Sequence, residues 1–306
     1  MNNIIEIKDL KKHFKEVKAV DGISFCVKEG QLFAFLGLNG AGKSTTINII
    51  CNLLEKDGGE VYIDGLSIDD NMQKIKPRLG VVFQENSLDV RLSVYDNLKY
   101  RAGIYGLRGK AFEERLKYLA DRLQFSDILK RPFGKLSGGQ QRRIDIARAL
   151  MHSPKILILD EPTTGLDPNT RITVWEFLNE LRKDMGLTIL LTTHYMEEAG
   201  EADYVVIIDS GKIVASDTPN NLKNQYAYDF IKIYEYSPDL KERLADGEVE
   251  FKEESGYLII EVKEIAKAKE ILTAYAQYIN DFEVIKGKMD NVFLNVTGKQ
   301  LKEEIK

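Results

Sequence analysis

Cysteine is scarce in this 306-residue chain, which contains only Cys26 and Cys51. Small secreted domains are held together by several disulfides, so this cysteine content excludes a disulfide-based scaffold. Both residues lie in apolar stretches, which predicts buried thiols in a reducing compartment. The chain is long enough to bury a large core, and we expect more than one domain.

Long apolar runs are also missing. The longest ones, such as residues 156–159 and 204–208, are far shorter than the roughly 20 residues that cross a bilayer. The first residues show no basic segment followed by an apolar stretch, so no signal peptide is expected. The net charge of −5 gives no overall attraction to nucleic acid, and no nucleic-acid partner is expected. Any role at a membrane would therefore depend on a partner protein.

One glycine-rich stretch, residues 37–45, fits the pattern G-x-x-x-x-G-K-[ST] of a phosphate-binding loop. An apolar run at 32–36 precedes it, and residues 47, 50, 51 and 54 form an apolar helical face after it. Glycines let the backbone N–H groups turn towards an anion, and the helix start adds its positive dipole end. The alternative is a plain glycine-rich turn between a strand and a helix.

The side chains of this stretch favour nucleotide binding over a plain turn. Lys43 can reach the terminal phosphates of a nucleoside triphosphate, and the hydroxyl of Ser44 can bind Mg²⁺. The predicted phosphate-binding residues are Gly37, Asn39, Gly40, Ala41, Gly42, Lys43, Ser44 and Thr45.

A second stretch, residues 156–161, is an apolar run that ends in two carboxylates. Continuous apolar runs are typical of buried parallel strands, and ligands gather at the carboxyl ends of such strands. Asp160 is then expected beside the phosphate loop, where it can hold Mg²⁺, and Glu161 can orient or deprotonate a water molecule. The alternative is a strand that stops in a solvated acidic turn.

A third stretch, residues 136–140, reads Leu-Ser-Gly-Gly-Gln and lies directly before a helical pattern. Serine and two glycines at a helix start provide a second terminus that can receive an anion. Taken alone, the stretch is also explained as an ordinary N-cap with a flexible entry.

The spacing of apolar residues and the local composition divide the chain into two parts. Residues 1–219 alternate between strands and helices, with a helical insert at about 85–152 that includes the apolar faces Leu116–Leu119–Leu123 and Ile144–Ala147–Leu150. Residues 220–306 predict a small α+β domain with strands at 230–236, 257–262 and 282–285, a further strand at 248–251, and a helix near 265–275. The order β-α-β-β-α-β is compatible with a ferredoxin-like module.

Together, these motifs resemble the ATP-binding cassette family, the nucleotide-binding component of ABC transporters. The resemblance covers roughly residues 4–217 and implies an α/β fold, a P-loop NTPase cassette with a helical signature subdomain. In chain order the motifs are the phosphate loop at 37–45, Gln84, the signature at 136–140, the acidic strand at 156–161, the aspartate loop at 165–167, and His194.

The resemblance implies a role for each matching residue. Glu161, His194, Gln84 and Lys43 would be catalytic, and Ser44, Gln84 and Asp160 would hold Mg²⁺. Residues of the signature, namely Ser137, Gly138, Gly139 and Gln140, would bind ATP held by a second cassette. Phe14 would stack on adenine, with core packing as the alternative, and Asp167 would lie at the dimer interface. His13 and His152 match no motif and are expected to be structural.

A finer resemblance concerns the transported class. Residues 289–299 and the loop at 36–46 are similar to cassettes of the ABC-2 class, which includes drug and polysaccharide exporters. This implies an ATPase that powers export through a separate membrane-spanning permease, as a head-to-tail homodimer on the cytoplasmic face of the cell membrane. Residues 88–105 are the expected docking surface for the permease. The alternatives are an importer subunit, or a non-transport ATPase that acts on nucleic acid or ribosomes.

Overall fold

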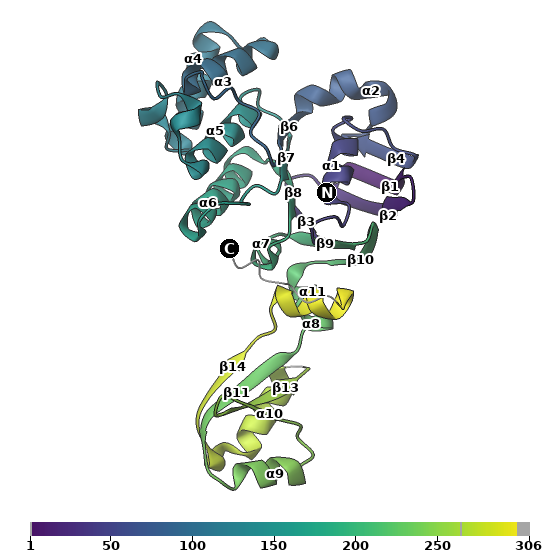
Figure 1. Cartoon of the computed structure of the whole chain (residues 1–306), viewed down its shortest axis with the longest axis vertical. Helices are drawn as coiled ribbons and strands as arrows, with labels where there is room; N and C mark the ends of the chain where they lie inside the picture. The colour runs from purple at the N-terminus through teal and green to yellow at the C-terminus, as the bar shows by residue number, and fades with distance from the viewer. Residues whose placement is uncertain (1, 264, 299–306) are drawn as a thin grey trace.

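The computed structural model describes residues 2–263 and 265–298. Figure 1 shows a larger upper part, which contains the N-terminus, and a smaller module below it. Lys299, at the end of the stretch resembling ABC-2 cassettes, lies outside the described residues, as do residues 300–306 of the predicted second domain.

A six-stranded sheet forms the centre of the larger part, in the order β10-β9-β3-β8-β7-β6. All neighbouring pairs are parallel except β9 and β10. The strands are β3 (Leu32–Leu36), β6 (Leu79–Val82), β7 (Ile156–Asp160), β8 (Thr188–Thr193), β9 (Tyr204–Asp209) and β10 (Lys212–Asp217). Because β3, β7 and β8 are wholly buried, their continuous apolar runs have the character expected of central parallel strands.

A second, antiparallel sheet covers one face of the first, in the order β2-β1-β4-β5. It is built from β1 (Asn3–Phe14), β2 (Val17–Lys28), β4 (Gly58–Ile63) and β5 (Leu66–Ser67). Side chains alternate along each strand, so Val27 is buried and its neighbour Cys26 is exposed. The prediction that both cysteines are buried is therefore wrong for Cys26 and confirmed for Cys51.

Helix α1 (Lys43–Ile50) is the next element after β3, and its residues Ile47 and Ile50 are buried as predicted. The helix ends at Ile50, whereas the predicted apolar face extends to residue 54. Asn52 adopts a left-handed backbone conformation with a φ of 55°, which an α-helix cannot contain, so Leu54 lies beyond the helix.

The helical insert contains α3 (Val94–Ile104), α4 (Gly109–Arg122) and α5 (Gly138–Leu150), grouped on one side of the central sheet in Figure 1. The two predicted apolar faces are buried and belong to the same core as the sheet. Further helices of the larger part are α2 (Ile68–Ile75), α6 (Pro168–Met185) and α7 (Met196–Gly200).

The smaller module has its own sheet and its own core. Its elements are β11 (Asp229–Tyr236), α9 (Leu240–Asp246), β12 (Lys252–Glu254), β13 (Tyr257–Val262), α10 (Ile265–Ala274) and β14 (Ile279–Ile285). They follow the predicted order β-α-β-β-α-β, and the antiparallel sheet has the order β12-β13-β11-β14. The core includes Ile231, Leu240, Leu258 and Ile271.

The strand predicted at 248–251 is displaced to β12. Residues 248 and 249 instead close α9, since the Val249 N–H donates to the Leu244 carbonyl and Glu248 has a φ of 54°. Val249 and Phe251 then pack against the module's core, which explains the apolar pattern without a strand.

Two helices connect the module to the larger part. These are α8 (Pro219–Tyr226) and α11 (Met289–Thr297), which contact each other. Leu222 of α8 and Phe293 of α11 belong to the core cluster of the larger part, and α11 also packs against α7. Hence the chain leaves the larger part after α8, forms the module, and returns with α11 (Figure 1).

Candidate active site

The phosphate-binding stretch at residues 37–45 comprises the loop from β3 to α1 and the first residues of α1, and it needs glycine at two close approaches. A Cβ on Gly42 would lie 2.3 Å from the Ala19 carbonyl oxygen, and its φ of 111° is unfavourable for other residues. A Cβ on Gly37 would lie 2.5 Å from the Ile208 carbonyl oxygen. The loop is therefore fixed against the neighbouring strands, with its N–H groups at the start of α1.

Lys43 is buried inside this loop, with 3% of its surface exposed. Its ammonium donates to the carbonyls of Gly37 at 2.7 Å and Leu38 at 3.2 Å. Glu161 Oε1 lies 3.2 Å from the same Nζ atom. Burial lowers the pKa of Lys43, while the charges of Glu161 and Asp160 act in the opposite direction. A positive charge is thus held where the loop would receive phosphate.

Glu161 lies one residue beyond β7, in a left-handed conformation with a φ of 48°. It is 6% exposed, and its Oε2 accepts a hydrogen bond from Thr164 Oγ1 at 3.1 Å. His194 Nδ1 lies 3.4 Å from this oxygen, at ion-pair distance but without hydrogen-bond alignment. The nearby His194 and then Lys43 hold the pKa of Glu161 at about 2, against the burial that raises it. The structure therefore brings together Lys43, Glu161 and His194.

Asp160 and Ser44 form a neighbouring pair of oxygen ligands. Ser44 Oγ donates to Asp160 Oδ1 at 3.2 Å, and Thr192 Oγ1 donates to the same oxygen at 2.5 Å. Carboxylate and hydroxyl oxygens suit Mg²⁺, so the residues present fit this ion. Sequence reasoning missed Thr192, which orients Asp160 from the adjacent strand β8; the parallel register Asp160–Thr192 carries that contact.

Gln84 lies two residues beyond β6, at the sheet edge where β7 also ends. Its side chain is exposed. Within residues 2–263 and 265–298, no hydrogen bond or ion pair joins it to Ser44 or Asp160. The register of β6 and β7 brings Gln84 to the same edge of the sheet as the predicted site.

Arg142 is a second residue that sequence reasoning missed. It lies in α5, is 6% exposed, and donates to the carbonyls of Glu161 at 2.7 Å and Pro162 at 2.6 Å. A third bond, of 2.7 Å, reaches the carbonyl of Phe83, next to Gln84. Arg142 thereby connects the helical insert to the backbone of Glu161. In the sequence, the position of Arg142 shortly after the signature is the signal that could have indicated its role.

The signature residues begin helix α5. Ser137 is the N-cap of α5 and forms a capping box with Gln140, which confirms that the segment serves as a helix N-cap. Ser137 and Gly138 are nevertheless exposed. A Cβ on Gly139 would lie 2.4 Å from Thr170 Cγ2, so glycine is needed for packing there. In the described part of the chain, no hydrogen bond joins this segment to the phosphate loop of the same molecule.

Asp167 lies beside the signature and caps α6, accepting from the Thr170 N–H at 3.0 Å. Hydrogen bonds from Thr170 lower the pKa of Asp167. The side chain is exposed, which leaves it available to a second molecule.

The remaining predicted residues are distributed around the site. Phe14 is 47% exposed at the end of β1, which rules out core packing as its role. Its ring lies 5.5 Å from the Lys12 ammonium. His13 faces Asp21 at 3.7 Å, and His152 stacks on Tyr105 with ring centroids 3.8 Å apart.

The segment at 88–105 contains both buried and exposed apolar side chains. Val94 and Leu98 are buried, whereas Tyr100 and Ile104 are 66% and 72% exposed. Ile104 and Tyr105 line a cavity of about 300 Å³ that also includes Arg101 and His152. An exposed apolar surface therefore lies on α3.

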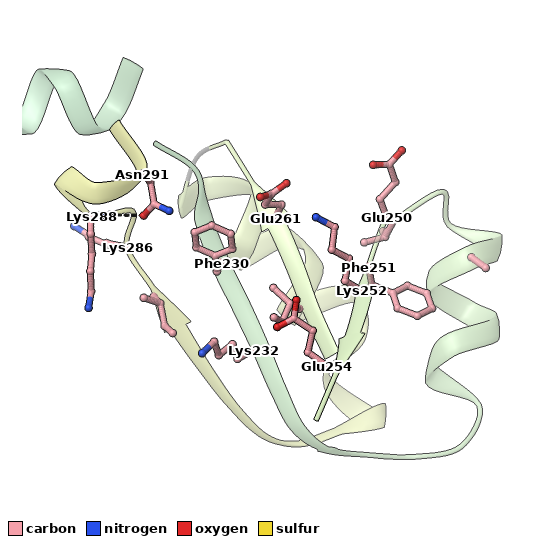
Figure 2. Close-up of a pocket in the computed structure, with 14 residues that line it drawn as sticks. Phe230, Lys232, Glu250, Phe251, Lys252, Glu254, Glu261, Lys286, Lys288 and Asn291 are labelled. Atoms are coloured by element: carbon pink, nitrogen blue, oxygen red, sulfur yellow. Dashed lines mark hydrogen bonds between the residues drawn. The ribbon is translucent and has the colours of Figure 1, made fainter. Parts of the chain in front are cut away.

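A cavity larger than the one beside α3 lies elsewhere, on the smaller module. It measures about 760 Å³ and is lined by Phe230, Lys232, Glu254 and Glu261 among others (Figure 2). Asn291, from the stretch that resembles ABC-2 cassettes, also lines it.

Comparison with known proteins decides the family. A family model described as "ABC transporter" matches residues 20–164. The probable multidrug ABC transporter ATP-binding protein YbhF of Escherichia coli is 39% identical over 74% of this chain, which spans only 39% of that relative's length. The daunorubicin resistance ATP-binding protein DrrA2 of Streptomyces coeruleorubidus is 34% identical over 96% of this chain and 95% of the relative. The chain belongs to the ABC transporter family.

Among solved structures, the cassette MJ0796, described as dimeric, post-hydrolysis and bound to ADP and Pi, matches with a TM-score of 0.63. Its sequence is 28% identical, and the match covers 70% of this chain and 98% of that one. The larger part of the chain is thus an ATP-binding cassette with the predicted P-loop NTPase fold. The described residues include no helix that is both long and apolar enough to cross a membrane.

Proposed function

We propose that this cassette hydrolyses ATP and thereby powers export through a separate membrane-spanning permease. One observation carries the proposal. Lys43, Glu161 and His194 converge beside the phosphate-binding loop, where β3, β7 and β8 end. A cation, a buried carboxylate and an imidazole are the groups that phosphate hydrolysis needs.

Each residue then has a physical task. Lys43 and the amides of residues 37–45 bind the phosphates of ATP, and Ser44, Asp160 and Gln84 hold Mg²⁺. The metal ion, when bound, neutralises charge on the phosphate oxygens. The exposed ring of Phe14 offers an aromatic face to adenine.

Glu161 acts as the general base in this proposal, and its surroundings suggest how nucleotide controls it. A carboxylate with a pKa of about 2 is a weak base near neutral pH. Phosphate oxygens compete for the Lys43 ammonium, which weakens its ion pair with Glu161. The pKa of Glu161 then rises, and the carboxylate becomes free to accept a proton from water, while His194 faces the same phosphate.

A second copy of the chain completes the site in this proposal. Ser137, Gly138, Gly139 and Gln140 would contact the ATP of the partner molecule, with Asp167 at the interface. The exposure of Ser137, Gly138 and Asp167, and the separation of the signature from the phosphate loop of its own chain, support contact in trans. Two copies arranged head to tail would form two equal sites with closed two-fold symmetry.

Export rests on the relatives, one described as a probable multidrug protein and another as a daunorubicin resistance protein. The permease would dock on residues 88–105, where Tyr100 and Ile104 are exposed, and would hold the cassette at the inner face of the membrane. No specific observation favours an importer or an ATPase acting on nucleic acid or ribosomes.

The domain division is also a proposal. Because α8 and α11 share the core of the cassette, we assign residues 1–227 and 288–298 to it. Residues 229–286 would then form the accessory module, in place of a single boundary at 219–220.

Purified chain tests the catalytic part of the proposal. It should release phosphate from ATP in the presence of Mg²⁺, and Glu161→Gln should abolish turnover while ATP binding persists. Light scattering on the same variant should report dimer only with Mg²⁺ and ATP. Turnover unaffected by Glu161→Gln would contradict the assignment of the base, and co-purification with ribosomes instead of a membrane protein would contradict export.

A further inference from the structure

Glu198 is a buried carboxylate near the site that none of the proposed roles uses. It lies in the short helix α7 and is 5% exposed. Thr163 Oγ1 donates to one of its oxygens, and Thr193 Oγ1 donates to the other at 2.6 Å. Both threonines are 1% exposed. One carboxylate thus joins two segments that are far apart in the sequence.

The two segments carry two of the site residues. Thr163 follows Glu161 by two positions, and Thr193 immediately precedes His194. The Thr193 hydroxyl also accepts from the Tyr195 N–H at 2.9 Å, so the backbone is held on both sides of His194. Since Glu161 Oε2 lies 3.4 Å from His194 Nδ1, the connections form a closed ring through Glu198.

Glu198 is not needed to attach α7 to the rest of the molecule. Met196 and Ala199 of the same helix are buried in the core of the cassette, and α7 also contacts α11. The carboxylate is therefore available for a more specific task. It does not contact Lys43 or the phosphate loop through any hydrogen bond or ion pair within the described residues.

We propose that Glu198 is a positioning residue for ATP hydrolysis, which fixes the distance between Glu161 and His194. The inference deepens the proposed function and rests on it. Catalytic groups must be held close to their productive geometry, and a misplacement of about 1 Å can cost about 100-fold in rate. By tying both segments to one carboxylate, Glu198 would hold the base and the imidazole in register.

Steady-state kinetics and ATP affinity together test this role. Glu198→Ala should lower kcat about 10- to 100-fold, with the Kd for ATP within about twofold of wild type, because the phosphate loop is untouched. Glu198→Gln should retain most of the activity. Its amide has the same shape, accepts from one threonine, and donates to the hydroxyl oxygen of the other.

Two further variants complete the set. Thr163→Val removes one hydroxyl donor at constant shape, so it should lower kcat by a smaller factor, and it covers the case in which Glu198→Ala does not fold. Glu197→Gln changes the adjacent, exposed carboxylate of the same helix and should behave as wild type.

The decisive comparison adds Glu198→Ala to His194→Ala. If Glu198 acts by positioning His194 against Glu161, the double variant should have a kcat less than about twofold below that of His194→Ala alone. Equal losses in Glu198→Gln and Glu198→Ala, full additivity with His194→Ala, or a wild-type kcat in both Glu198→Ala and Thr163→Val would overturn the inference. A wild-type chain without ATPase activity would instead contradict the proposed function itself.

Discussion

The cassette and the accessory module differ in where they bury charge. In the cassette, Lys43, Arg142, Asp145, Asp160, Glu161 and Glu198 are all buried. The core of the module, as far as the structure describes it, is formed by apolar side chains alone. Yet the module carries a cavity of about 760 Å³, with charged side chains such as Lys232 and Glu261 in its lining (Figure 2).

The difference indicates that buried charged residues identify a catalytic site better than the size of a cavity does. An ionised group inside a protein is costly unless it is paired, so its burial needs a reason. In the proposed function the reason at the cassette site is phosphate, which would take over partners such as Lys43 when it binds. The cavity on the module shows no comparable arrangement, since its carboxylate Glu261 is exposed.

The largest expected effect is on kcat, and it comes from comparing a substitution of a buried carboxylate with one of an exposed carboxylate. Glu161→Gln should lower kcat for ATP about 10²- to 10⁴-fold, because the general base is lost. Glu261→Gln, in the wall of the cavity on the module, is the matched control and should leave kcat unchanged. Phosphate release measures both, and a comparable loss from the two substitutions would remove the distinction between the regions.

The next prediction concerns the boundary between the regions. Phe293→Ala in α11 should destabilise the cassette by about 3–5 kcal/mol, since Phe293 is fully buried in its core. Ile260→Ala should destabilise the module by about 2–5 kcal/mol and leave the cassette intact. Thermal inactivation of the ATPase should therefore shift in the first variant and stay constant in the second. The opposite result would place α11 outside the cassette.

A further prediction concerns how the free energy of unfolding changes at acidic pH. Because the pKa of Glu161 is about 2 in the folded chain and 4.5 without its surroundings, the charged form stabilises the fold. Its contribution, about 3 kcal/mol, should be complete above about pH 4.5 and decline as pH falls towards 2. Urea unfolding of the wild type and Glu161→Gln, compared from neutral pH downwards, measures it. A difference that stays constant with pH would contradict the ion-pair account.

The smallest effect concerns adenine. Phe14→Ala should raise the KM for ATP about two- to tenfold with little change in kcat, since one aromatic contact is lost. Phe14→Tyr should restore the wild-type KM, because the ring is retained. An unchanged KM in Phe14→Ala would leave its exposed ring without a role in binding.

Sequence reasoning predicted the parts of the cassette whose chemistry depends on local pattern. The phosphate loop, Glu161 and His194 each follow a buried strand, and parallel strands bring their carboxyl ends to one edge. The convergence of Lys43, Glu161 and His194 follows from this rule and from the family resemblance.

Other features depend on partners that no local pattern names. The sequence predicted no helix at residues 289–297, which form α11 and pack against α7 of the cassette. Arg142 and Glu198 have ordinary positions on helices, and their importance appears only from the carbonyls and hydroxyls that surround them. The apolar residues near 249–251 fit a strand as well as a helix end, and the backbone at Glu248 decides between them.

In the proposed function each site is shared by two copies of the chain, and the ATPase rate of mixed variants tests this sharing. Glu161→Gln removes the base but keeps the signature, whereas Ser137→Arg blocks the signature but keeps the base. Each variant alone should be inactive. An equal mixture should recover roughly one quarter of the wild-type ATPase rate, since half of the dimers would contain one complete site. An inactive mixture, under conditions where light scattering shows that the two variants dimerise, would contradict a shared site.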